Sequence, residues 1–388
     1  MTPPLSPTLF PPLLLATDGS PSARLAQRLL YPIAQLLQSQ SPVSVEDAET
    51  PGEEITLLMA VTVQPRSSNR GDRLNRQPRQ PPPPTATTDL TTTDVTTVTT
   101  STTLTTHQAP LSLEQLTALV QTEVPAGLSL SFQVRQGRPA TEILNYARAI
   151  QAGLIAVGHR GTGGMRELLL GSVSTVIARY AFCSVLVARG SQQTEPPATP
   201  SLNHVLLLID GSLASRQAIA TVLQLVPIGI ERVTLLCVQS PIGVNKNLFG
   251  AFGSPTLSWQ LNQSLQTAQK EQGEQLLKRA KAALAGTNLD IQTRMQTGDP
   301  APLICQVAQE QGANLIILGS DPTRRSLLSP LQVLRPGKRQ PEDGPTKSRQ
   351  ALRNTRLSVT EDYVIHYAPC PVLLCRTPRA AQTQGEVG

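Results

Sequence analysis

The chain has 388 residues with a formal net charge of +6, only 3% aromatic and 15% charged residues, and 34 prolines. This length exceeds that of one ordinary domain and suits two or three. Few aromatic and charged residues beside many prolines predict a modest globular part interrupted by Pro- and Thr-rich tracts.

No apolar run approaches the roughly 20 residues of a membrane-spanning helix. Residues 1–20 contain an apolar patch, but prolines interrupt it and no basic region precedes it, which argues against a secretory signal peptide. We therefore expect a soluble, cytoplasmic protein with no membrane segment.

Five cysteines are an odd number, they form no close pairs with zinc-ligand spacing, and several lie in apolar runs. This pattern predicts buried free thiols in a reducing compartment and no metal site. The cysteines are Cys183, Cys237, Cys305, Cys370 and Cys375.

The first predicted element is an apolar strand that ends before Asp18-Gly19-Ser20, and an amphipathic helix follows as far as Leu30. The same order returns at His204–Leu223, where Asp210-Gly211-Ser212 follows the apolar run. Both stretches predict a strand, a turn and a helix. The chain therefore contains two copies of one fold.

Three further pairs of similar stretches follow in the same order in both copies. They are residues 55–63 with 232–240, residues 131–158 with 291–319, and residues 180–189 with 367–376. Short apolar strands alternate with amphipathic helices in each copy, which predicts an α/β fold with a parallel sheet and helices on both of its faces.

The repeat predicts two domains with an insertion in each. The predicted segments are a first domain at 1–190 with a disordered Pro/Thr-rich insertion at 65–110, a linker at 191–201, a second domain at 202–378 with a basic insertion at 321–357, and a tail at 379–388.

Glycines crowd the stretch from Gly158 to Ser172, directly after an apolar strand. Ligands of open parallel sheets lie beyond the carboxyl ends of the strands, and glycines there leave backbone N–H groups free to face phosphate oxygens. Residues 173–181 are helical in pattern, so Ser172 is predicted to be the N-cap of a helix that points its N-terminus at the ligand. A purely structural glycine-rich turn is the alternative.

The spacing of Gly158, Gly161, Gly171 and Ser172 resembles, without a gap, the nucleotide-binding signature of the universal stress protein family. The resemblance covers both copies apart from the insertions and tails. It implies two tandem Rossmann-like domains, each an open sheet of five parallel strands, and ATP as the ligand, with or without Mg²⁺.

The resemblance also implies a role for each site residue. Asp18, Gly19 and Ser20 would hold the adenine and ribose end together with the backbone near Val61, where the second strand is expected to end. Gly158 and Gly161 would lie along the ribose and phosphates, and Gly171, Ser172 and Val173 would bind the phosphate tail. For Asp18, an Asx turn before a helix remains the alternative.

The second copy lacks the later glycines of the signature. Aligning Cys370 with Cys183 places Ser358 opposite Gly171 and Val359 opposite Ser172. Asp321 would in addition repel a phosphate. We therefore expect one competent nucleotide site, in the first domain, and one degenerate site in the second.

The closing strands, Cys183–Ala188 and Val372–Cys375, are apolar with little charge. The resemblance implies that such strands pair, so the two domains are expected to pack about a pseudo-twofold axis within the chain. A homodimer and burial of these residues in separate cores remain alternatives, and any protein partner is unknown.

The leading hypothesis is an ATP-binding stress-response or signalling module. No positioned base, metal-ligand cluster or P-loop lysine is evident, so no catalytic residue is assigned and at most slow ATP hydrolysis is expected. One alternative is an adenine-nucleotide hydrolase or adenylating enzyme, although the pyrophosphate glycines that it needs beside Asp18 are absent. The other is an adaptor acting through the basic residues from Arg324 to Arg356, for which nucleic acid is disfavoured because no aromatic residues are interleaved.

Overall fold

The computed structural model describes residues 9, 12–40, 58–64, 113–128, 130–160, 170–189, 197, 199–241, 255–321 and 357–376. Several predictions lie outside these residues: the insertion at 65–110, nearly all of the insertion at 321–357, Gly161, most of the linker at 191–201, and the tail at 379–388.

The first half of the chain alternates strands and helices as the sequence predicts. Its elements are β1 (Leu13–Ala16), α1 (Pro21–Gln40), β2 (Leu58–Gln64), α2 (Leu113–Thr122), β3 (Leu130–Gln136), α3 (Pro139–Ala149), β4 (Leu154–Gly158), α4 (Ser172–Tyr180) and β5 (Ser184–Ala188).

The second half repeats this order with a much longer helix after its second strand. Its elements are β6 (His204–Leu208), α5 (Leu213–Leu225), the 3-10 helix η2 (Val226–Ile228), β7 (Arg232–Gln239), α7 (Pro255–Leu284), β8 (Asp290–Thr297), α8 (Pro300–Gln311), β9 (Leu315–Gly319), α10 (Val359–Tyr367) and β10 (Val372–Cys375).

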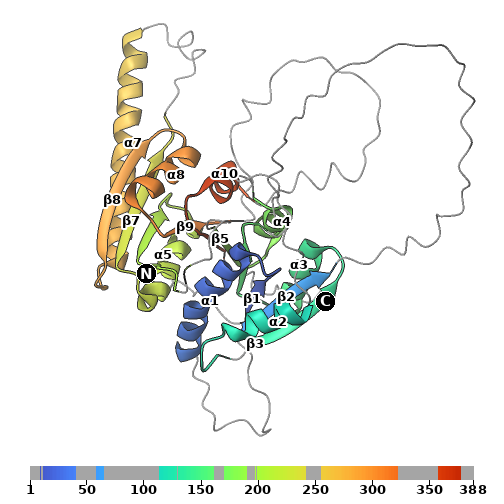
Figure 1. The fold of residues 1–388 in the computed structure, drawn as a ribbon. Helices are drawn as coiled ribbons and strands as arrows, with labels where there is room; N and C mark the ends of the chain where they lie inside the picture. The colour runs from blue at the N-terminus through green and yellow to red at the C-terminus, as the bar shows by residue number, and fades with distance from the viewer. Residues whose placement is uncertain are drawn as a thin grey trace, which may run out of the picture.

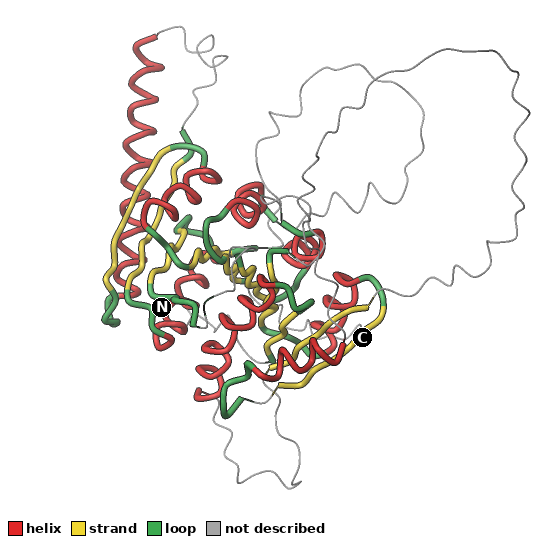
Figure 2. Tube along the Cα trace, in the orientation of Figure 1, coloured by secondary structure: helices red, strands yellow, loops and turns green. Residues whose placement is uncertain are grey.

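The described strands form one ten-stranded sheet in the order β3-β2-β1-β4-β5-β10-β9-β6-β7-β8 (Figures 1 and 2). Within each half all five strands pair in parallel. The prediction of five parallel strands in each half is therefore confirmed, and the two sets join in one sheet. In each half the first strand lies at the centre. The next two strands are added on one side of it and the last two on the other side.

Helices cover both faces of the sheet, as expected for apolar strands. Leu13 and Leu15 of β1 pack on the face shared with α1, α2, α5 and α7, whereas Leu14 and Ala16 pack on the face shared with α3, α4, α8 and α10. Because successive strand residues point to opposite faces, β1 contributes to both cores.

The two halves meet through β5 and β10, the only antiparallel pair among the described strands. Leu373 lies opposite Leu186 at the middle of this pair, with both side chains buried. The expected pairing of the closing strands is thus present. On one face, the side chain of Gln224 donates to the carbonyl of Leu9 at 2.8 Å and so links α5 to the first half.

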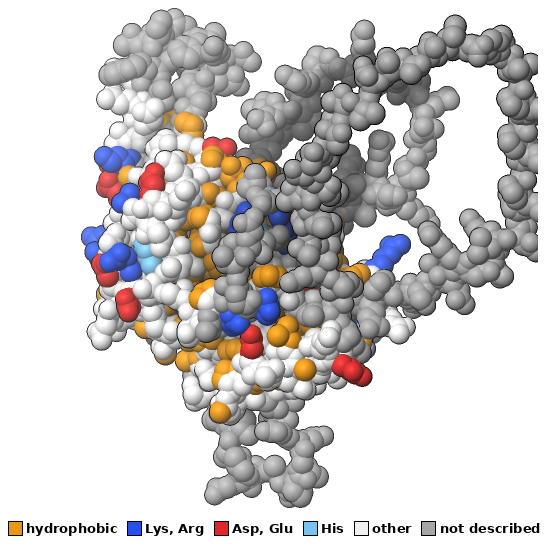
Figure 3. Space-filling model, in the orientation of Figure 1, with side chains coloured by type: hydrophobic (Ala, Val, Ile, Leu, Met, Phe, Trp, Pro, Cys, Tyr) orange, Lys and Arg blue, Asp and Glu red, His pale blue; other side chains and the backbone are white. Residues whose placement is uncertain are grey.

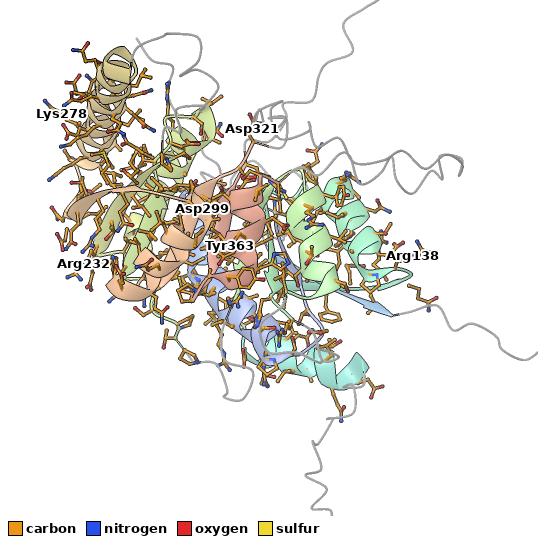
Figure 4. All side chains as sticks on the ribbon, turned by 90° about the horizontal axis from the view of Figure 1, so that it is seen from above. Arg138, Arg232, Lys278, Asp299, Asp321 and Tyr363 are labelled. Atoms are coloured by element: carbon orange, nitrogen blue, oxygen red, sulfur yellow. The ribbon has the colours of Figure 1, made fainter. Side chains whose placement is uncertain are left out.

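On the other face, α4 and α10 lie side by side over the centre of the sheet, where Figure 4 labels Tyr363 on α10. Arg179 of α4 forms an ion pair with Asp362 of α10 at 2.7 Å.

Four of the five cysteines, all except the half-buried Cys305, are buried, and all five are free, as predicted. Burial raises the pKa of the Cys183, Cys370 and Cys375 thiols to about 12, so these thiols stay protonated at neutral pH.

Candidate nucleotide site

The turn after β1 is an Asx turn. The backbone N–H of Ser20 donates to Asp18 Oδ1 at 3.1 Å, and Gly19 supplies a positive φ of 75°. The second half repeats this turn: Ser212 N donates to Asp210 Oδ1 at 2.9 Å. Asp18 is thus a turn-forming residue, and its side chain is exposed at the C-terminal edge of the sheet.

This turn is fastened to the loop after β4. Ser20 Oγ donates to the carbonyl of Arg160 at 3.0 Å, the Ser22 hydroxyl donates to the same carbonyl, and Arg160 N donates to Ser22 Oγ at 3.3 Å. Ser20 is buried, and its hydroxyl also accepts from Ala23 N at 3.3 Å. Its hydroxyl therefore joins two loops of the candidate site. The sequence did not identify Ser22.

Close packing leaves no room for a side chain at Gly158. A Cβ on this residue would lie 2.5 Å from Ser22 Oγ and 2.7 Å from Ala23 N, because the start of α1 crosses the end of β4. Gly319 repeats this in the second half, where a Cβ would collide with the backbone of Ala214 and Ser215. Because the half without the glycine signature needs this glycine too, close packing accounts for it without any ligand.

Gly171, not Ser172, is the N-cap of α4, so the predicted cap was off by one residue. The Gly171 carbonyl accepts from Thr175 N at 2.9 Å and so starts the helix, whereas Ser172 already has the position of a first-turn residue. No side chain caps this described helix end. The N–H groups of Ser172 and Val173 have no acceptor within the helix.

Two hydrogen bonds hold this helix end against β4. Gly171 N donates to the carbonyl of His159 at 2.7 Å, and Ser174 Oγ donates to the carbonyl of Gly158 at 2.6 Å. The sequence did not identify Ser174. These bonds place the start of α4 beside the last residues of β4, at the C-terminal edge of the sheet, with Ser172 exposed.

Val61 lies in β2 beside Ala16 of β1. The strand continues to Gln64, so it ends three residues later than the position expected from the sequence. Its backbone is thus one strand away from Asp18, on the side of β1 opposite to β4.

His159 is buried at 4% exposure, and its N–H donates to the carbonyl of Ala188 at 2.8 Å. Burial, with smaller contributions from Arg189 and Arg160, lowers the pKa of His159 to about 4. The imidazole is therefore neutral at physiological pH, and its Nδ1 atom is buried without a hydrogen-bond partner.

The equivalent helix end of the second half is closed by its own side chains. Ser358 is the N-cap of α10: Ser358 Oγ accepts from Glu361 N at 3.1 Å, and Ser358 N donates to Glu361 Oε2 at 2.6 Å. Glu361 is buried, which raises its pKa. It follows Ser358 by three residues, as Ser174 follows Gly171. The second half therefore has a carboxylate, that of Glu361, at this helix end, whereas the first half has the hydroxyl of Ser174.

Charge on the described surface is mixed in sign. In Figure 3, basic and acidic side chains alternate along the edge where α7 and β8 run, and an ion pair joins Arg232 to Asp290 there at 2.9 Å. Asp321, labelled in Figure 4, is exposed just after β9. The basic residues from Arg324 to Arg356, on which an adaptor role would depend, lie outside the described residues.

The sequence profile of the Universal stress protein family matches residues 10–189 and residues 202–332, which together make up most of the chain. The chain belongs to the universal stress protein family. The two matched segments make it a tandem member with one family unit in each half of the sheet.

Individual universal stress proteins match shorter stretches of this chain. Universal stress protein YxiE of Bacillus subtilis is 47% identical over 53 residues, 14% of this chain and 36% of YxiE. Universal stress protein Sll1388 of Synechocystis is 34% identical over 76 residues, 20% of this chain and 49% of Sll1388. The chain thus covers between about a third and a half of the length of these relatives.

A crystal structure from Pseudomonas aeruginosa, described as a universal stress protein, superposes with a TM-score of 0.52 at 14% identity and covers 96% of this chain and 95% of its own. This likeness concerns the fold alone.

Of the helices that the structure describes, none combines the length and apolar character needed to cross a membrane. The described residues also contain no group of three or more His, Cys, Asp or Glu side chains arranged to hold a metal ion.

Proposed function

We propose that this universal stress protein binds one adenine nucleotide, ATP, in its first half, and that binding serves a stress-response or signalling role. The phosphate tail binds at Gly171, Ser172 and Val173, after passing Gly158 and Gly161. The adenine and ribose end lies toward Asp18, Gly19, Ser20 and the backbone at Val61.

The observation that carries this proposal is the uncapped N-terminus of α4. Its first-turn N–H groups stand at the C-terminal edge of the sheet, the helix dipole favours an anion there, and no side chain takes the place of one. Hydrogen bonds from Ser20, Gly171 and Ser174 bring the turn after β1, the loop after β4 and this helix end together.

The N-terminus of α10, the equivalent helix, supports a degenerate site in the second half. There the carboxylate of Glu361 accepts from the Ser358 N–H at the N-terminus of α10. The capping box occupies the Ser358 and Glu361 N–H groups, so a phosphate at the neighbouring Val359 and Thr360 N–H groups would lie beside this carboxylate and meet its like charge. The Asx turn at Asp210 remains, but beside a capped helix end it offers little to a phosphate tail.

Calorimetric titration of the full chain with ATP and Mg²⁺ tests both statements. Wild type is expected to bind about one equivalent, and Gly171→Asp is expected to bind none because its carboxylate would lie at the phosphate position. Ser358→Asp, the matched change in the second half, is expected to leave binding unchanged.

Circular dichroism of both variants controls for folding, because a Cβ on Gly171 would lie 3.3 Å from the carbonyl oxygen of His159. Two equivalents in wild type, or loss of binding in Ser358→Asp alone, would overturn the assignment.

A further inference from the structure

Arg376 is the most buried charged residue in the described part of the chain, with no exposed surface. It follows β10, in the second half, but its side chain reaches into the first. Nη1 donates to the carbonyl of Ala181 at 2.7 Å, and Nη2 donates to the carbonyl of Ala178. These carbonyls belong to the C-terminal end of α4, whose N-terminus is the proposed phosphate site.

The placement satisfies a specific electrostatic need. The last carbonyls of a helix lack hydrogen-bond donors within the helix and carry the negative end of its dipole, so a cation there is stabilising. Helix α4 is only nine residues long, Ser172 to Tyr180. A short helix depends on tertiary contacts for its position, and α4 receives a contact at its end from the other half of the chain.

Arg376 is itself held from several directions. Its Nε donates to Ser320 Oγ at 3.3 Å, just after β9, and its backbone N–H donates to Ser184 Oγ at 3.1 Å. The carboxylate of Glu361 lies near enough for the charge of Arg376 to favour the ionised form. The planar guanidinium thus bridges the edge of the second half and the helix of the first.

A reciprocal contact shows that this is a feature of the pseudo-twofold arrangement. Arg189, which follows β5, donates to the carbonyls of Ile365 and His366, at 3.4 Å and 2.5 Å, at the C-terminal end of α10. Each half therefore supplies the cation for the other half's final helix. Of these two helices, α4 is the one whose N-terminus has no side-chain cap.

We propose that Arg376 is a positioning residue for the nucleotide site: supplied by the second half, it fixes the C-terminal end of α4 so that the N–H groups at the other end stay aimed at the phosphate tail. This inference rests on the proposed nucleotide function and adds a role for the second half, which binds no phosphate itself but completes the support of the site that does.

The test compares Arg376→Met with Leu284→Ala in the full chain. Leu284 is buried in α7, at the far edge of the second half, so its truncation lowers stability without touching α4. Hydrogen exchange of the α4 amides is measured relative to those of α3, and the ATP dissociation constant is measured well below both melting temperatures.

For Arg376→Met, we expect α4 to exchange at least about tenfold faster relative to α3, and the ATP dissociation constant to rise at least about fivefold. Leu284→Ala should leave both values within about twofold of wild type. Arg376→Lys, which keeps the charge but loses the planar fork, should be intermediate.

Ser320→Ala removes one contact of the guanidinium and should act in the same direction more weakly; with Arg376→Lys it carries the test if Arg376→Met does not fold. Equal α4 exchange and equal ATP affinity in the Arg376 and Leu284 variants would overturn the proposal. If wild type binds no ATP, the proposed function fails, and the exchange of α4 alone decides whether Arg376 positions this helix.

Discussion

Gly158 and Gly319 each stand where a helix crosses the end of a strand so closely that a Cβ would overlap backbone atoms. We predict that Gly158→Ala and Gly319→Ala each lower the free energy of unfolding by at least about 2 kcal/mol, because the overlap forces a backbone shift. Gly286→Ala is the control, since nothing lies within 4 Å of its Cβ position. It should change stability by less than about 1 kcal/mol.

Urea denaturation measures all three variants. A neutral Gly319→Ala would contradict the packing explanation, because the second half has no glycine signature to provide another reason for this residue. If Gly158→Ala were to abolish ATP binding without loss of stability, Gly158 would instead be a ligand-facing residue, as the family resemblance implies.

The residues of the site were only partly predictable from sequence. The glycine spacing and the repeat located Gly158, Gly171 and Asp18 at one edge of the sheet. The bonds that join them could not be read, because Ser22 and Ser174 are ordinary polar residues whose partner carbonyls lie 138 and 16 positions away. The charge at Arg376, after a run of apolar residues, gave no sign that it is buried against a helix 195 positions away.

At the level of elements, α4 and α10 are equivalent helices with different starts. Gly171 begins α4 without a side-chain cap, whereas Ser358 and Glu361 form a capping box on α10. We predict that Ser358→Ala lowers the free energy of unfolding by about 1 kcal/mol, the usual value of an N-cap. Ser172→Ala should change it by less than about 0.5 kcal/mol, because this exposed serine is not the cap.

Denaturant titrations of the two variants, run side by side, give this comparison. A cost for Ser172→Ala equal to that of Ser358→Ala would mean that Ser172 caps α4 after all. Sequence pattern placed this helix correctly but missed its first residue, because glycine and serine both occur at N-caps and adjacent candidates are separated only by backbone geometry.

For the whole molecule, the continuous sheet couples the two halves. Strands β5 and β10 are buried on both faces, and Arg376 and Arg189 cross between the halves. We therefore predict a single cooperative thermal transition, with the amides of β5 and β10 exchanging at the same, slowest rate. Two well-separated calorimetric transitions would show that the halves unfold independently and that the junction contributes little.

The overall architecture was largely predictable from sequence, because a repeat of alternating apolar strands and amphipathic helices leaves few arrangements open. Pairing of the closing strands followed from the family resemblance and not from the pattern, since a β-strand's sequence does not specify its partner, and the antiparallel direction of the pair is seen only in the structure. The exchange of arginines between the halves depends on that pairing and becomes visible only in three dimensions.

We propose that one half of this tandem universal stress protein binds the nucleotide while the other half supports the site. A crystal structure of the full chain grown with ATP tests this most directly. We predict phosphate density within hydrogen-bonding distance of the Ser172 and Val173 N–H groups, with the Ser358–Glu361 capping box intact and no nucleotide beside it. Nucleotide at the N-terminus of α10, or at neither helix, would contradict it.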